Sequence, residues 1–255
     1  MKHRTTVITL ANQKGGSGKT TSCHALGAGL TRRGYKVLFV DLDAQANLSY
    51  TSGIGRTALS SMEVLTGTAK AEEAIQTTPA GDIIPASSVL AEANSIITDT
   101  GREYRLKEAL EPIKVNYDFI LLDTSPARSI LTVNSFTASD KLVIPAEANA
   151  YSVQGIGGLS ETIIAVKKYC NPNLVVSGVL LTRYNPRAVL TRDFTSFAEQ
   201  VAASLDTRVY KTKIRENISL KEAQALQTDI FSYAPKSNGA IDYNAFVDEF
   251  LQERK

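Results

Sequence analysis

Residues 12–21 form a glycine-rich turn that reads Asn12-Gln13-Lys14-Gly15-Gly16-Ser17-Gly18-Lys19-Thr20-Thr21. The short apolar run before it, residues 5–11, predicts a buried strand, and the stretch after it predicts a helix that ends near Gly34. A strand, a glycine-rich turn and a helix in that order are typical of a phosphate-binding loop, where backbone N–H groups and the helix N-terminus face phosphate oxygens. A turn that merely starts a helix is the alternative, but Gly-Lys-Thr in this setting favours phosphate binding.

The loop predicts specific roles for its Lys-Thr pair. Lys19 is expected to neutralise the β- and γ-phosphates of a bound nucleotide, and the Thr20 hydroxyl to ligate Mg²⁺. The nucleotide-binding residues that the loop itself predicts are Gly15, Gly16, Ser17, Gly18, Lys19, Thr20 and Thr21.

Further apolar runs predict the rest of the sheet. They cover residues 36–41, 117–123, 141–145 and 174–181, and longer amphipathic stretches separate them. Because the runs lack polar alternation, they suit parallel strands covered on both faces. We therefore expect residues 1–255 to form one α/β domain, a doubly wound, mainly parallel sheet with helices on both faces and ligands at the carboxyl ends of its strands.

Two less regular segments carry their own predictions. Residues 52–101 are punctuated by glycines and predict surface helices with a short strand at 82–85. Residues 241–251 predict a helix that docks on the core. Its apolar face would carry Ile241, Ala245, Phe246, Val247 and Phe250, with Asp242, Asp248 and Glu249 elsewhere.

Composition excludes several classes of protein. The chain has 255 residues, 43% hydrophobic and 21% charged, which is ordinary for a globular domain. No apolar stretch approaches the roughly 20 residues that span a bilayer, and the basic N-terminus lacks the features of a signal peptide. Cys23 and Cys170 are too far apart in sequence for a disulfide framework, which favours a cytoplasmic protein. With a net charge of only +2, any nucleic-acid binding requires local clustering of basic residues.

Three acidic residues follow predicted strands. Asp41 and Asp43 alternate along an extended chain, which places both on one side at a carboxyl end, where they can hold metal-bound water and orient the attacking water. Solvated acids that cap the next helix are the alternative. Asp123 ends the strand predicted at 117–123, the position of a Walker B acid that binds magnesium through water.

The loop departs from a strict Walker A pattern in having Gln13 in place of the first glycine and Lys14 as a second lysine. This variant resembles the deviant Walker A loop of the ParA/MinD family. The resemblance implies an ATPase in which Lys14 reaches across a sandwich dimer to the partner's nucleotide. It also implies that Asp43 is the catalytic, water-orienting residue. The catalytic set is then Lys14, Lys19 and Asp43, and the magnesium set Thr20, Asp43 and Asp123, with the acids acting through water.

The resemblance extends over nearly the whole chain. The motif around Arg183 and Asn185 is similar to the family's base-recognition segment, and residues 213–223 and 233–240 resemble stretches of ParA proteins. ParA in particular implies an ATP-bound homodimer, nonspecific double-stranded DNA, a ParB-like partner and association with the nucleoid. The acidic terminal helix disfavours membrane cycling of the MinD kind. We expect no helix-turn-helix before Thr5.

A local excess of basic residues between Arg183 and Lys221 predicts where DNA phosphates bind. The candidate DNA-binding residues are Arg187, Arg192, Lys211, Lys213, Arg215 and Lys221. A solvated basic edge is the alternative. Two other functions stay open: a nucleoid-based positioning ATPase for a protein cargo, and a cargo-delivery or assembly ATPase that does not bind DNA.

Overall fold

A computed structural model describes residues 5–55, 57–187 and 190–253, with side chains except at 150–155 and 190–193. Its seven strands form one sheet in the order β3-β4-β2-β5-β1-β6-β7. All neighbouring strands are parallel except β3 and β4, which are antiparallel. The strands are β1 (Thr6–Leu10), β2 (Val37–Leu42), β3 (Gln76–Thr78), β4 (Gly81–Ile84), β5 (Phe119–Thr124), β6 (Lys141–Glu147) and β7 (Val175–Thr182).

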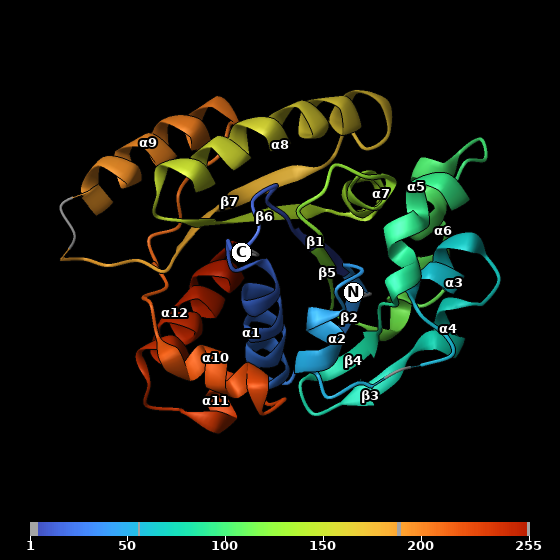
Figure 1. The fold of residues 1–255 in the computed structure, drawn as a ribbon, viewed down its shortest axis with the longest axis horizontal. Coiled ribbons are helices and arrows are strands. Elements are labelled where there is room, and N and C mark those ends of the chain that lie inside the picture. Colours follow the sequence, from blue (N-terminus) through green and yellow to red (C-terminus); the bar gives the residue numbers. More distant parts are fainter. Residues whose placement is uncertain (1–4, 56, 188–189, 254–255) are drawn as a thin grey trace.

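Helices cover both faces of this sheet (Figure 1). On one face lie α1 (Lys19–Thr31), α2 (Asn47–Thr51), α10 (Ile218–Ala225), α11 (Ile230–Tyr233) and α12 (Asn238–Gln252). On the other lie α3 (Ser61–Thr66), α4 (Ala71–Ala74), η1 (Ser88–Glu92), α5 (Ala93–Ile96), η2 (Arg102–Tyr104), α6 (Arg105–Leu110), η3 (Lys114–Asn116), α7 (Ile130–Ala138), α8 (Ala150–Tyr169) and α9 (Leu190–Ser204). The predicted doubly wound α/β fold is confirmed.

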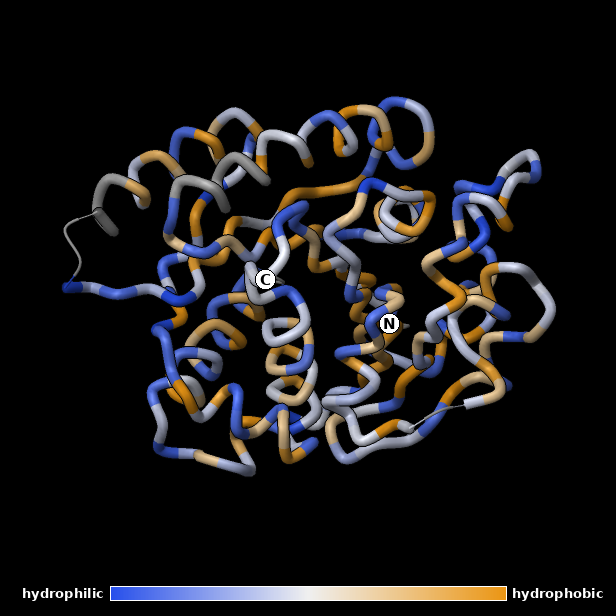
Figure 2. Tube along the Cα trace, viewed as in Figure 1, coloured by the Kyte–Doolittle hydropathy of each residue, from blue (hydrophilic) through white to orange (hydrophobic). Residues whose placement is uncertain are grey.

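The core follows from the two-residue period of the strands. In β2, Phe39 packs with α1 and α12, whereas its neighbours Leu38 and Val40 pack with the helices of the opposite face. Every residue of β2 and β5 is buried, as expected for central strands covered on both sides. Apolar segments accordingly concentrate along the sheet (Figure 2).

The five long strands lie where the apolar runs predicted them, with ends shifted by one or two residues. The short strand expected at 82–85 is β4, and β3 pairs with it as an antiparallel edge that the sequence did not indicate. Within the described residues, no helix has the length and apolar character needed to cross a bilayer.

The terminal helix α12 docks on the core, as predicted, but the prediction of its buried face was partly wrong. Ile241 is 51% exposed, whereas Asp242 is 8% exposed. Asp242 is drawn inward because Arg215 donates to it from the guanidinium and from its backbone N–H. An ion pair with good geometry thus overrides the hydrophobic pattern.

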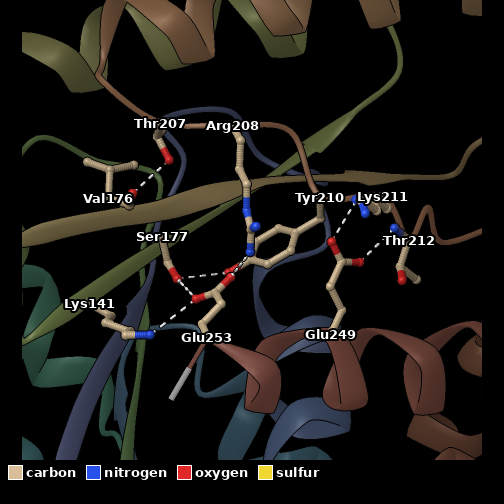
Figure 3. A network of polar contacts seen from close by, with 10 residues as sticks. All are labelled: Lys141, Val176, Ser177, Thr207, Arg208, Tyr210, Lys211, Thr212, Glu249 and Glu253. Atoms are coloured by element: carbon tan, nitrogen blue, oxygen red, sulfur yellow. Dashed lines mark hydrogen bonds and ion pairs between the residues drawn. The ribbon is translucent and has the colours of Figure 1, made fainter. Parts of the chain in front are cut away.

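A segment after α9 extends the edge of the sheet beside β7. The Tyr210 N–H donates to Val179 O, and the Ile214 N–H donates to Leu181 O. Acids of α12 hold this segment: Glu249 accepts the N–H groups of Lys211 and Thr212 (Figure 3). The chain is thereby led to the carboxyl ends of the strands, where α10 begins.

Candidate nucleotide site

A cavity of about 690 Å³ opens at the carboxyl ends of the strands. Its walls come from the glycine-rich loop, from Asp43 after β2, from Thr182 and Arg183 at the end of β7, and from α10 and α12. A volume of this size accommodates a nucleotide. Its position is the one expected for a ligand of a doubly wound sheet.

The loop backbone requires glycine. Gly16 and Gly18 have φ values of 75° and 86°, in the left-handed region that side chains other than glycine rarely adopt. The Thr182 hydroxyl, from the end of β7, donates to Ser17 O at 2.9 Å and fixes the loop against the sheet. α1 then starts at Lys19, so its first N–H groups face the cavity that the loop lines.

Lys19 is the loop's buried cation. Its side chain lines the cavity, the residue is 6% exposed, and Nζ donates to Lys14 O at 3.2 Å. Burial lowers the pKa of Lys19, and the charges of Asp123 and Asp43 oppose that shift. A triphosphate in the cavity would add negative charge beside this ammonium and favour its charged form.

The predicted magnesium ligands Thr20 and Asp123 lie together. The Thr20 hydroxyl donates to Asp123 Oδ2 at 2.7 Å. Among the described residues, no group hydrogen-bonds the buried Asp123 Oδ1, and burial followed by the charge of Asp41 raises the pKa of this carboxyl well above its usual range. A buried, half-satisfied carboxylate beside a hydroxyl fits a divalent cation, directly or through water.

The two acids after β2 have different surroundings. Asp43 lines the cavity, and its Oδ1 accepts the N–H of Gln45. Asp41 is wholly buried, and both of its oxygens accept bonds, one from the Asp43 N–H and the other from the N–H and hydroxyl of Ser49. Burial raises the pKa of Asp41 to about 6, although these hydrogen bonds oppose the rise. Only Asp43 of the predicted pair is placed to meet a ligand.

Lys14 does not line the cavity, whereas Gly15 and the following loop residues do. Its backbone N–H donates to Asn12 Oδ1, and its Nζ donates to Asn149 Oδ1 at 3.2 Å. Lys14 therefore contacts the residue just before α8 and does not line the pocket that Lys19 lines.

Comparison with known proteins identifies the family. A family model described as an AAA domain matches residues 5–176. The sporulation initiation inhibitor protein Soj of Bacillus subtilis is 38% identical over 242 residues, which cover 93% of this chain and 94% of that protein. The chromosome partitioning protein ParA of Caulobacter vibrioides is 35% identical over 256 residues, with 98% and 95% covered. The chain belongs to the ParA/Soj family of P-loop ATPases.

A solved structure shares this fold. Cobyrinic acid a,c-diamide synthase from Mycobacterium smegmatis, determined with bound ADP and magnesium, superposes with a TM-score of 0.86 at 33% identity. The match covers 98% of this chain and 95% of that one.

In this ParA/Soj-family chain, part of the cavity wall was not predicted from the sequence. Gln224 of α10 donates to Thr21 Oγ1 at 2.9 Å, and Tyr243 of α12 shares a hydrogen bond with Ser22. Asn217 caps α10 by accepting the N–H of Ser219. These residues lie some 200 positions after the loop, and their local sequence does not indicate that they reach it. Thr182 could have been located, because it ends β7 and ligands were expected at the carboxyl ends of the strands.

The two predicted base-recognition residues are placed differently. Arg183 lines the cavity with a left-handed φ of 47°, and its guanidinium lies 3.8 Å from Glu147. Asn185 is exposed and does not line the cavity, and its Oδ1 accepts the N–H of Arg187 instead. The structure brings only Arg183 to the pocket.

The six predicted DNA-binding residues do not form one uniform group. Arg187 and Lys211 are exposed, and exposed Lys221 lies at the cavity wall. Lys213 lies over the Tyr184 ring at 4.7 Å, and Arg215 is paired with Asp242 while it also lines the cavity. Arg192 lies in α9 at a position whose side chain is outside the described part of the structure.

Proposed function

We propose that this chain is an ATP-dependent dimerisation switch that segregates a plasmid, chromosome or mobile element with a ParB-like partner. The observation that carries the proposal is the contrast between the two loop lysines. Lys19 lines its own pocket, whereas Lys14 does not line it and bonds Asn149, a contact that it would exchange for the nucleotide of a second subunit. Pairing of two subunits would then depend on the γ-phosphate that both lysines reach.

The cavity residues divide the work of hydrolysis. Backbone N–H groups of residues 15–19 and the Lys19 ammonium hold the phosphates. Asp43 accepts a hydrogen bond from the attacking water and orients it toward the γ-phosphate. Thr20 and Asp123 would hold Mg²⁺, which when bound neutralises charge on the phosphate oxygens.

Basic residues that are paired with acids at α12 are less able to bind DNA than basic residues with exposed side chains. Arg208 pairs with Glu253, and Arg215 forms a two-pronged pair with Asp242 (Figure 3 shows the Arg208 pair). Arg187, Lys211 and Lys221 keep exposed side chains. We assign the contacts with DNA phosphates chiefly to these three residues, in the ATP-bound form. The ParB-like partner then stimulates ATP hydrolysis, which releases the chain from DNA.

The test is a titration of random-sequence duplex DNA with the chain in ATP and in ADP at several salt concentrations. We expect tight binding only with ATP. The triple variant Arg187→Ala, Lys211→Ala, Lys221→Ala should bind about 10- to 100-fold more weakly, with a salt slope reduced by about 2 to 3. A matched control removes three exposed or half-exposed cations near α4 and α6, namely Lys70, Arg102 and Lys107.

A second arm follows turnover. Asp43→Ala should bind ATP yet remain on DNA, because it lacks the group that orients water. Equal DNA affinity with ATP and ADP would overturn the switch. An absence of DNA binding in both states would favour delivery of a protein or metal cargo, and equal losses in the triple variant and its control would overturn the assigned surface.

A further inference from the structure

Gln13, the residue that replaces the first glycine of a strict Walker A loop, joins three segments through its side-chain amide. Its Nε2 donates to Gly158 O of α8 at 2.9 Å. Its Oε1 accepts from Nε of Arg128, which lies in the loop after β5, at 3.1 Å. The amide is thus used at both ends, once toward a helix and once toward a loop.

Arg128 closes the same set of contacts. Its Nη2 also donates to Gly158 O, at 3.0 Å, so this one carbonyl accepts from two side chains that come from different loops. Its Nη1 pairs with Glu161 one helical turn further on, where both side chains are more than half exposed. The exposed ion pair contributes little free energy, so the contacts with Gln13 and Gly158 O define the arrangement.

The close approach depends on the absence of a side chain at position 158. A Cβ atom there would lie 2.3 Å from Gln13 Oε1 and 2.9 Å from Arg128 Nη2. Both atoms are at the ends of flexible side chains, so an added methyl group would displace them without disturbing the backbone. The neighbouring Gly157 has open space around the same position, although it lies in the same helix.

The joined segments carry groups that act on the nucleotide. Gln13 precedes Lys14, whose Nζ bonds Asn149 just before α8. Pro126, two residues before Arg128, lines the cavity, and Asp123 lies near the end of β5, from which the same loop leaves. A displacement of α8 would therefore move the start of the loop and the segment after Asp123 together.

We propose that Gln13 and Arg128 are positioning residues for ATP hydrolysis, which transmit the placement of α8 to Lys14 and to the loop after β5. Neither residue lines the cavity. Each acts through the backbone of its own loop, Gln13 on Lys14 and Arg128 on the segment after β5. The proposal concerns the ATPase reaction itself and does not require DNA binding or a ParB-like partner.

The experiment measures steady-state ATP hydrolysis of the full chain with magnesium. Gln13→Ala and Arg128→Ala should each lower kcat about 10-fold or more, with KM for ATP changed by less than about twofold, because loss of alignment affects the transition state more than ground-state binding. The double variant should be no slower than the slower single variant, since both remove one arrangement.

Two glycine variants separate the contact from effects on the helix. Gly158→Ala should lower kcat like Gln13→Ala, and it should have no further effect in the Gln13→Ala background, where the displaced amide is absent. Gly157→Ala gives the same gain in helix propensity but meets no neighbour, so its kcat should be unchanged. Glu161→Ala, which removes only the exposed pair, should also be unchanged.

The proposal is overturned if Gln13→Ala retains its kcat, if Gly158→Ala and Gly157→Ala behave alike, or if the losses of Gln13 and Arg128 simply add. If Gln13→Ala proves unfolded by circular dichroism, the comparison of the two glycine variants decides the matter alone. A rise in KM without a fall in kcat would assign both residues to nucleotide binding and would also overturn the proposal.

Discussion

Lys14 and Lys19 show how much one side chain's surroundings matter. Both stand in the same short loop, and the sequence gives each a lysine's charge and reach. Lys19 is buried at the cavity with a lowered pKa, whereas Lys14 bonds Asn149 outside it. The same contrast separates Asp43, at the cavity, from Asp41, whose oxygens are occupied by Ser49 and a backbone N–H.

The buried imidazole of His24 should make the stability of the folded chain depend on pH. It is buried in α1, stacks on Phe39 with ring centroids 5.9 Å apart, and has a pKa lowered to about 4 by burial, against the charge of Asp229. As the pH falls below about 6.5, the unfolded chain binds a proton here and the folded chain does not, until about pH 4. His24 by itself should therefore lower the free energy of unfolding by up to about 3 kcal/mol across this window, while Asp41, whose pKa is raised to about 6, acts in the opposite direction.

The measurement is urea denaturation at several pH values from 4.5 to 7 for the original chain and for His24→Gln. Relative to the variant, the original chain should lose stability as the pH falls, whatever the absolute stability of the variant. Parallel pH profiles for the two proteins would show that His24 is protonated in the folded state.

At the scale of elements, α12 is held by its acids as well as by its apolar face. Glu253, at the end of the helix, accepts from Lys141 at 3.1 Å and also bonds Ser177 and Arg208 (Figure 3). Its side chain is 14% exposed, and that of Lys141 is 20% exposed. This polar clamp joins the end of the helix to β6, to β7 and to the segment after α9.

Glu253→Gln should lower the free energy of unfolding by about 1 to 3 kcal/mol, because it leaves the half-buried Lys141 ammonium without its counter-charge. Asp248→Asn in the same helix is the matched control. It weakens a pair with Arg33 in which the acid is 60% exposed, so it should cost less than about 1 kcal/mol. Denaturant unfolding of both variants compares them, and equal losses would contradict a special role for the clamp.

For the whole molecule, the proposed switch requires that two subunits meet at the nucleotide site. If a second subunit completes it, the particle should be a monomer with ADP and a dimer with a non-hydrolysable ATP analogue and magnesium. Lys14→Ala should bind the analogue but dimerise at least about 10-fold more weakly, since a charge-assisted contact to phosphate is lost.

Analytical ultracentrifugation across a concentration series measures this change. Lys36→Ala is the control, because that exposed lysine precedes β2 at the opposite end of the sheet and carries the same charge. Dimers of equal stability in Lys14→Ala and in Lys36→Ala would contradict a role for Lys14 across the interface.

Local sequence determined the parts of this protein that depend on neighbouring residues. Mainly apolar runs without polar alternation specified the central strands, because a parallel strand buried on both faces needs apolar side chains in succession. Gly-Lys-Thr after such a strand specified the phosphate loop, and the apolar runs placed Asp43 and Asp123 at the carboxyl ends of β2 and β5.

Tertiary structure alone decided what depends on contacts between distant segments. It brought Gln224 and Tyr243 to the loop, turned Asp242 inward to Arg215, and placed Gly158 against Gln13. Such pairings have no periodicity along the chain, because they arise only when the crossovers of the sheet bring separate helices to one edge. The residues of the phosphate loop could thus be identified from local sequence, whereas the closure of its pocket and its contacts with α8 depend on the folded chain.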